Sequence, residues 1–223
     1  MNVLRQIFLL VGKDLRIEGR TRQTLGLVVV LGVLIVSVLG LGLSSRPDLA
    51  KAGTPAILWV AYLFAGVLCF EKTMAVERQD GALAGLLLAP IDRGVIYAAK
   101  LLSNLVLMGA VAAVITPVGI LFFGFDLSPA PGGFVAIIAL SMVGFAAIGT
   151  LFAALVSSTR LQGGLLALVV FPIVLPLVIA STQIITGMFD GRAPDGTALA
   201  ILVAFDAIFL AASWIVFEVV LEP

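Results

Sequence analysis

Long apolar segments dominate this chain and limit what it can fold into. Six of them approach or exceed the roughly 20 residues that a helix needs to cross a bilayer. They lie at about residues 25–43, 54–70, 97–123, 134–156, 163–186 and 197–220. Within lipid, a helix satisfies its own backbone hydrogen bonds. We therefore predict an all-α integral membrane protein with six transmembrane helices, which form a single domain over residues 1–223.

The composition agrees with this prediction and argues against several kinds of function. Of the 223 residues, 61% are hydrophobic and 12% are charged, whereas soluble domains carry about 25% charged residues. The net charge is zero, so nothing indicates a nucleic-acid partner. Cys69 is the single cysteine, which excludes an internal disulfide, and histidine, the commonest metal ligand and acid–base group, is absent. We expect neither a catalytic site nor a metal site.

Residues 1–22 differ from a signal peptide, because a long charged segment comes first. Apolar residues recur there at helical spacing and make one face: Leu4, Ile7, Phe8, Val11 and Leu15. The basic residues fall mainly on the other face: Arg5, Lys13, Arg16 and Arg20. This pattern predicts an amphipathic helix that lies in the membrane interface. The alternative is an ordinary cytoplasmic leader.

The distribution of lysine and arginine predicts the orientation. With both termini in the cytoplasm, ten of these residues are inside: Arg5, Lys13, Arg16, Arg20, Arg22, Lys72, Arg78, Arg93, Lys100 and Arg160. Three are outside: Arg46, Lys51 and Arg192. The positive-inside rule favours this orientation, which puts residues 71–100 in the cytoplasm beside the N-terminal helix.

The stretch from Glu71 to Lys100 contains the densest group of charges between two spans. Five charges fall within ten residues: Glu71, Lys72, Glu77, Arg78 and Asp80. None has an opposite charge three or four positions away, where helical neighbours meet. We therefore expect these side chains to be free for water or for another protein. The alternative is a solvated loop that only connects two spans.

The second half of this stretch predicts a return to the membrane. Asp80-Gly81 indicates a helix end or turn, and residues 83–88 form a short apolar helix that is too short to span. Pro90 ends that helix. Asp92 is the expected N-cap of the next span.

No phosphate-binding loop is present. Such a loop needs G-x-x-x-x-G-K-[ST], and the nearest approach, Gly94 and Lys100, lacks the second glycine and opens a membrane helix. If this chain takes part in ATP-driven work, the ATPase is another polypeptide. That polypeptide would contact the cytoplasmic segment at residues 71–96.

Asp206 lies near the middle of the sixth span, about 13 Å from its start. A carboxylate at the centre of a bilayer costs about 3 kcal/mol on insertion scales. We expect it to face protein or water, to be protonated and to bond to a hydroxyl on another helix. A structural role is favoured, and the alternatives are a proton or cation site in an intramembrane enzyme or a proton-coupled carrier.

Small residues and prolines in the spans indicate close packing and bends. The pairs Gly109/Ala113 and Gly149/Ala153 give small-xxx-small faces. Pro117, Pro172 and Pro176 free backbone carbonyls and bend their helices. No internal repeat is convincing, which argues against a transporter built from inverted repeats.

Several segments together resemble the CcmB family, the heme exporter B subunit of the cytochrome c maturation system. They are WVAYLFAGVLCFEKTMAVE, ERQDGALAGLLLAPIDRGVIYAAKLLSN, FPIVLP and WIVFEVVLEP. The likeness covers nearly the whole chain in length, six-span layout and N-terminal amphipathic helix. The segment from Glu77 to Lys100 is its specific part.

The resemblance implies a multi-pass, non-catalytic permease of ABC-2-like architecture in the bacterial inner membrane. Its expected partners are a cytoplasmic ABC ATPase that binds ATP, heme-handling membrane subunits, a periplasmic heme chaperone and a second copy of the permease. The implied ATPase-coupling residues are Glu71, Glu77, Arg78, Asp80, Gly81, Pro90, Arg93 and Lys100, braced by Arg16 and Arg20.

Because the chain has no histidine to serve as the usual heme ligand, we expect no cofactor here and heme mainly on a partner. The alternative function is a permease of the same class for a lipid, a drug or a polysaccharide.

Overall fold

The structure is a computed structural model that describes residues 2–79, 85, 91–157 and 164–220, without the side chains of residues 78–79 and 218–220. Its long helices are α1 (Val3–Thr21), α2 (Gln23–Gly42), α3 (Pro47–Gln79), α5 (Arg93–Phe123), α6 (Pro131–Ser157), α7 (Leu165–Phe189) and α8 (Gly196–Val220). In this part of the chain, six helices are long and apolar enough to cross a membrane. The prediction of six spans in an all-α chain is confirmed.

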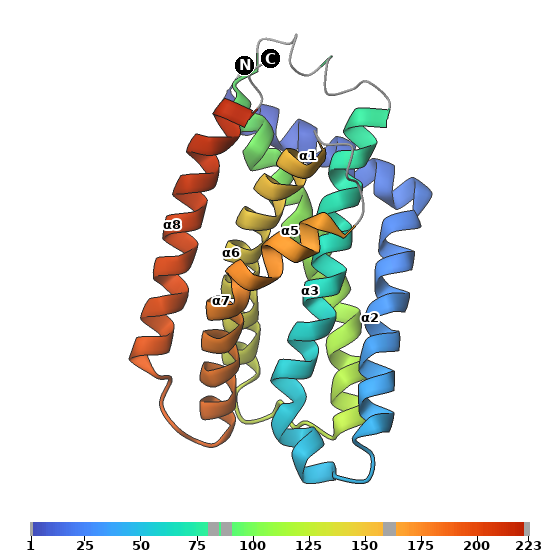
Figure 1. The fold of residues 1–223 in the computed structure, drawn as a ribbon, viewed down its shortest axis with the longest axis vertical. Coiled ribbons are helices and arrows are strands. Elements are labelled where there is room, and N and C mark those ends of the chain that lie inside the picture. The colour runs from blue at the N-terminus through green and yellow to red at the C-terminus, as the bar shows by residue number, and fades with distance from the viewer. Residues whose placement is uncertain (1, 80–84, 86–90, 158–163, 221–223) are drawn as a thin grey trace.

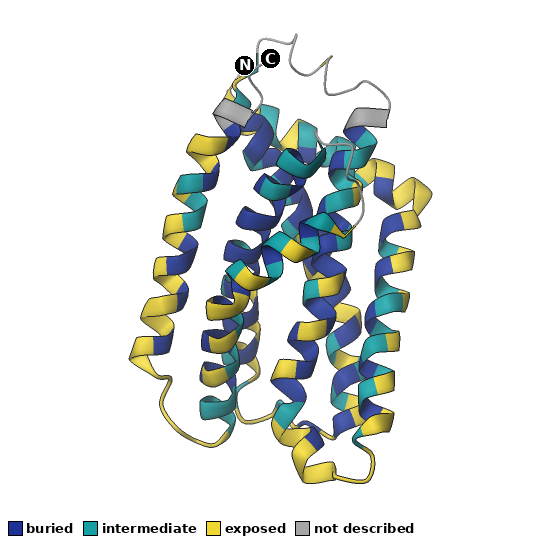
Figure 2. Cartoon of the chain, viewed as in Figure 1, coloured by how far each residue is buried: buried dark blue, intermediate teal, exposed yellow. Residues whose placement is uncertain are grey.

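The six long apolar helices form an up-and-down bundle, and α1 lies across one end of it (Figure 1). The start of α1, the end of α3, the start of α5 and the end of α8 are all at this end, which we call the α1 end. Helices α3 and α6 are the most buried (Figure 2). Helices α2 and α8 lie at opposite edges and present exposed apolar side chains along most of their length.

Helix α3 is longer than the predicted second span. It begins at Pro47, so most of residues 44–53, which separate the first two predicted spans, are helical. Proline is favoured in a first helical turn, and Asp48 complements the helix dipole there. At the other end, α3 continues to Gln79 because no helix-breaking residue interrupts residues 71–79. The charges of Glu71, Lys72 and Glu77 therefore stand on a continuous helix rather than in a loop.

The return to the membrane is described from residue 91. The Asp92 side chain accepts a hydrogen bond of 2.8 Å from the backbone N–H of Gly94, which confirms Asp92 as the N-cap of α5. The predicted turn at Asp80-Gly81, most of the short apolar helix at 83–88 and Pro90 lie outside the described residues.

A sharp corner joins α1 to α2. Arg22 ends α1 in the left-handed region, with φ 52°. The buried carboxylate of Glu18 then accepts a hydrogen bond of 2.7 Å from the backbone N–H of Leu25, in the first turn of α2. This N–H has no partner within its own helix, so Glu18 acts as a remote N-cap. One side chain of α1 thus fixes the direction in which α2 leaves it.

The core between α3 and α6 is built by two reciprocal ring-into-glycine contacts. The ring of Phe145 on α6 lies against Gly66 on α3, and the ring of Phe70 on α3 lies against Gly149 on α6. The two rings meet edge to face, with centroids 5.1 Å apart. The Gly149/Ala153 face is therefore used for packing, as the sequence predicted. Gly109 lies on the exposed side of α5, where a Cβ atom would meet nothing within 4 Å.

Helix α7 changes direction along its length, and its first half crosses in front of the bundle (Figure 1). Pro172 and Pro176 both lie inside this helix. Each removes a backbone donor and clashes with the preceding turn, which accounts for the bend. In the first half of α7, the ring of Phe171 meets the ring of Phe64 of α3 edge to face, with the ring centroids 5.2 Å apart.

The corner between α1 and α2 yields a first testable prediction. Glu18→Ala removes the remote cap and is expected to lower the free energy of unfolding by about 1 kcal/mol. Glu18→Gln keeps an acceptor oxygen and should retain most of that stability. Thermal unfolding of the detergent-purified chain, followed by tryptophan fluorescence, would measure both. Equal loss in the two variants would contradict a capping role.

Candidate functional site

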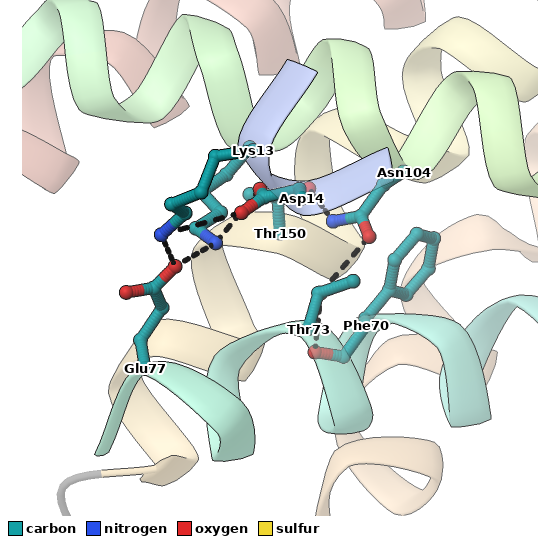
Figure 3. Close-up of polar contacts among 8 residues, drawn as sticks. Lys13, Asp14, Phe70, Thr73, Glu77, Asn104 and Thr150 are labelled. Carbon is teal, nitrogen blue, oxygen red and sulfur yellow. Dashed lines mark hydrogen bonds and ion pairs between the residues drawn. The ribbon is translucent and has the colours of Figure 1, made fainter. Parts of the chain in front are cut away.

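Four charged side chains from three helices meet at the α1 end of the bundle (Figure 3). Lys100 of α5 donates to Glu77 of α3 at 2.6 Å and to Asp14 of α1 at 2.8 Å. Lys13 of α1 donates to the same oxygen of Glu77, Oε1, and lies 3.4 Å from Asp14. Two cations and two anions thus form one network, which we call the ion cluster.

Burial makes the ion cluster energetically important. The side chains of Glu77, Lys100 and Asp14 are 2%, 6% and 8% exposed, whereas that of Lys13 is 37% exposed. Removing one partner of a buried ion pair typically costs about 3–5 kcal/mol, because the remaining charge stays buried. Loss of a single buried charge would therefore weaken the contact of α1 with α3 and α5.

Helical spacing continues the polar contacts one turn deeper into the bundle. Thr73 lies four residues before Glu77 on α3, and Asn104 lies four residues after Lys100 on α5. The Thr73 hydroxyl donates to the Asn104 side chain at 2.9 Å, and the Asn104 amide donates to the Thr150 hydroxyl of α6 at 2.9 Å (Figure 3). This polar layer connects the ion cluster to the central helix α6.

A small cavity of about 30 Å³ adjoins the ion cluster, and Glu18, Thr24 and Lys72 are among its lining residues. Its volume is enough for about one water molecule. The second carboxylate oxygen of Glu77, Oε2, is buried and has no hydrogen-bond partner among the described residues. A water in this cavity would be well placed to satisfy it.

The structure brings two of the predicted coupling residues together. Glu77 and Lys100 bond directly, although they are 23 residues apart. The expectation that the side chain of Glu77 is free for water or another protein is wrong, because its partners come from other helices rather than from its own. Glu71, on the same helix, is half-buried, and its Oε1 has no partner within the described part of the chain.

The remaining predicted residues are placed as follows. Arg93 is half-buried in the first turn of α5 and makes a further interaction. Arg16 and Arg20 are exposed on α1 and take no part in the ion cluster. Asp80, Gly81, Pro90 and the side chain of Arg78 lie outside the described residues.

Sequence reasoning missed Lys13, Asp14 and Glu18 as site residues. A signal for them was present. Residues 14 and 18 share the helix face of Val11 and Leu15 by helical spacing. Carboxylates on the apolar face of an amphipathic helix imply buried partners, which here are Lys100 and the first turn of α2.

Asp206, on α8, is a further buried carboxyl group and takes no part in the ion cluster. The residue is 5% exposed, and neither of its oxygens has a hydrogen-bond partner among the described residues. The expectation of a bond to a hydroxyl on another helix is therefore wrong. On α6, Ser141 donates its own hydroxyl to the Ile137 carbonyl, one turn back.

Comparison with known proteins identifies the family. The family model described as "CcmB protein" matches residues 5–220. The chain belongs to the CcmB family. The matched range contains all four residues of the ion cluster and Asp206, so the resemblance drawn from the sequence is confirmed.

Three individual relatives are similar in sequence to this chain over most of its length. It is 28% identical over 202 residues to heme exporter protein B of Paracoccus denitrificans, covering 89% of this chain and 90% of that protein. It is 23% identical over 191 residues to heme exporter protein B of Pseudomonas aeruginosa, covering 86% and 85%. A similar protein from Bradyrhizobium diazoefficiens, also named heme exporter protein B, is 28% identical over 193 residues, covering 83% and 85%.

The burial of the ion cluster predicts a non-additive pair of substitutions. Lys100→Met leaves Glu77 and Asp14 with one cation, and it is expected to lower the free energy of unfolding by about 3 kcal/mol. Adding Glu77→Leu leaves the neutral pair of Lys13 and Asp14 and should restore most of this loss. Chemical denaturation of Lys100→Met, of Glu77→Leu and of the double variant would measure the coupling. A double variant as unstable as the sum of the two single ones would contradict it.

Lys13 predicts a dependence of stability on pH. Partial burial alone would lower its pKa, but the hydrogen bond to Glu77 and the nearby Asp14 outweigh this and raise the pKa above 10.5. A raised folded-state pKa gives stability that is fully present below the unfolded pKa of about 10.4 and is lost as the pH rises through the folded value. The unfolding temperature should therefore exceed that of Lys13→Gln by a constant amount at pH 7–9 and by less above about pH 10.5. A difference that grew with pH would contradict this prediction.

Proposed function

We propose that this chain is the membrane-spanning permease subunit of an ABC transporter that acts in heme export for cytochrome c maturation. The match of the family model over residues 5–220 carries the proposal, and the three relatives named above are each called heme exporter protein B. The six apolar helices agree with a multi-pass protein of the bacterial inner membrane. The chain itself is not catalytic, and a separate ATPase subunit hydrolyses ATP.

We further propose that the α1 end faces the cytoplasm and receives the ATPase. The basic residues support this orientation, because eight of the ten assigned to the inside belong to α1, α3 or α5 near this end, and a ninth, Arg22, joins α1 to α2. The segment that joins α3 to α5 would be the coupling element, with Arg78, Asp80 and Gly81 as its contacts. Its two ends continue into α3 and α5, which carry Glu77 and Lys100. Movement of the segment would therefore act directly on the two helices that form the ion cluster.

Helix α1 is proposed to lie in the membrane interface. It runs across the bundle, with Leu4 and Phe8 68% and 65% exposed, while Val11 is buried against the bundle. Arg16 and Arg20 are exposed on the same helix. Exposed apolar side chains beside exposed arginines suit the boundary between acyl chains and phosphate headgroups. The two arginines would brace α1 there while the ion cluster holds it to α3 and α5.

Heme is proposed to be held mainly by partner subunits. The chain has no histidine, and Cys69 and Tyr62 are buried at 0% and 1% exposure. The Tyr62 hydroxyl bonds to Thr116 at 2.6 Å, and the space between Tyr62, Cys69, Met108 and Met142 is filled. These groups are used in packing, which supports a coupling role over direct heme ligation.

Two copies of this chain are expected in the complex.

Purification of the tagged chain in mild detergent tests the proposal most directly. We expect a cytoplasmic ABC ATPase and a heme-handling membrane protein to copurify, as identified by mass spectrometry. Copurification of an ATPase without a heme-handling protein would support the assignment as an ABC permease but not the assignment of heme as its substrate. A well-behaved sample without an ATPase would overturn the proposal.

Coupling is tested by charge reversal at Arg78, because reversal of Glu77 would disrupt the ion cluster itself. Arg78→Glu is expected to leave assembly intact but to uncouple ATP hydrolysis from delivery of heme to the chaperone. Lys51→Glu is a matched control, since Lys51 is exposed at the other end of the same helix. Normal coupling in Arg78→Glu, with the complex assembled, would contradict a role for Arg78.

A further inference from the structure

We propose that Asp206 is a proton-binding site whose protonation state depends on the contact between α6 and α8. Its carboxyl group holds a proton while α8 is packed on α6. When the two helices separate and water enters, the group gives that proton to water and becomes a carboxylate.

The geometry places the carboxyl group inside the contact. A Cβ atom built on Gly144 of α6 would lie 2.1 Å from Oδ1 of Asp206, so the oxygen occupies the space that the glycine leaves. Leu177 of α7 and Phe205 of α8 lie around the same glycine. The group is thus enclosed by three helices and is not directed to lipid.

Within the described residues, α6 and α7 offer no charged side chain that could pair with Asp206. Helices α6 and α7 contain no Asp, Glu, Lys, Arg, Cys or Tyr anywhere along their length. From α5, the titratable residue Tyr97 contacts α8, where its ring meets Trp214 and Phe217. Trp214 is eight residues beyond Asp206, about 12 Å along the helix. On α8 itself, the other ionisable residue is Glu218, twelve residues away.

These two observations decide the protonation state. A buried carboxylate without a cation or a hydrogen-bond donor is strongly disfavoured, whereas the neutral acid loses much less on leaving water. The closed arrangement of α6 and α8 therefore requires the proton. By linkage, loss of the proton favours separation of the two helices, and separation favours loss of the proton.

No other described helix covers the outer side of α8 at this level. Helix α8 lies at the edge of the bundle, and its other side is exposed along the same turns, at Val203 and Ile208. Toward the α1 end, Ser213 of α8 and Tyr97 of α5 both donate to the carbonyl of Ala147 on α6, at 3.3 and 3.4 Å. Ala147 is fully buried, and its carbonyl group lies in this contact. We therefore expect a side chain at position 147 to become more accessible when α8 leaves α6.

The first test is infrared spectroscopy of the full chain in lipid vesicles at pH 7.5. We expect a carbonyl band of a protonated carboxylic acid that is absent in Asp206→Asn. A spectrum without this band, from folded protein, would overturn the proposal.

The second test measures helix separation through a cysteine at position 147. Cys69→Ser with Ala147→Cys provides one thiol between α6 and α8, and its reaction with a thiosulfonate reagent is followed from pH 7 to pH 10. We expect reaction at the upper end of this range to be about tenfold or more faster with Asp206 than with Asp206→Asn in the same background, because an unpaired buried charge opposes closure.

The rates of the Asp206 and Asp206→Asn proteins are compared at the same pH, because ionisation of the thiol itself also makes the reaction faster as the pH rises. Gly26→Ala, in the same background, is a control for mutation in a span, since its Cβ would meet nothing within 4 Å. Equal rates with and without Asp206 at every pH would overturn the coupling of the proton to the movement of α8.

Discussion

The packing of this protein depends on the rule that a buried charge needs a buried partner. Lys100 on α5 lies between Glu77 on α3 and Asp14 on α1, and Lys13 completes a neutral set. Helix α1 needs this set because only part of its apolar face is covered, with Leu4 and Phe8 largely exposed. The charges therefore decide where a surface helix docks, and Glu18 then decides the direction in which the first span begins.

The same cluster gives the α1 end its place in the proposed mechanism. The helices that contribute Glu77 and Lys100 are the two that the proposed coupling segment joins. Thr73, Asn104 and Thr150 extend the polar contacts from these helices to α6. A force applied by an ATPase at the proposed segment would thus act on α3 and α5, which the ion cluster joins to α1 and the polar layer joins to α6.

Glu77 and Asp206 are buried carboxyl groups that are neutralised in different ways. Glu77 is 2% exposed and is matched by two lysines close to the end of the bundle. Asp206 is 5% exposed near the middle of a span, where α6 and α7 offer no ionisable group. The first is held as an anion by cations, and the second is proposed to be held neutral by a proton. Their depth in the membrane and the charges of their neighbours account for the difference.

The sequence by itself determined the number of spans, the amphipathic N-terminal helix, the cap at Asp92 and the family, because these follow from local patterns of apolar residues and from motifs. It suggested that Glu77 lacks a partner, since helical spacing shows only neighbours on the same helix. Only the tertiary structure decided that Lys13, Asp14 and Lys100 surround Glu77, and that Asp206 faces a glycine rather than a hydroxyl. Contacts between residues 23 to 86 positions apart depend on how helices cross, and helix crossing is set by the packing of whole faces rather than by any one motif.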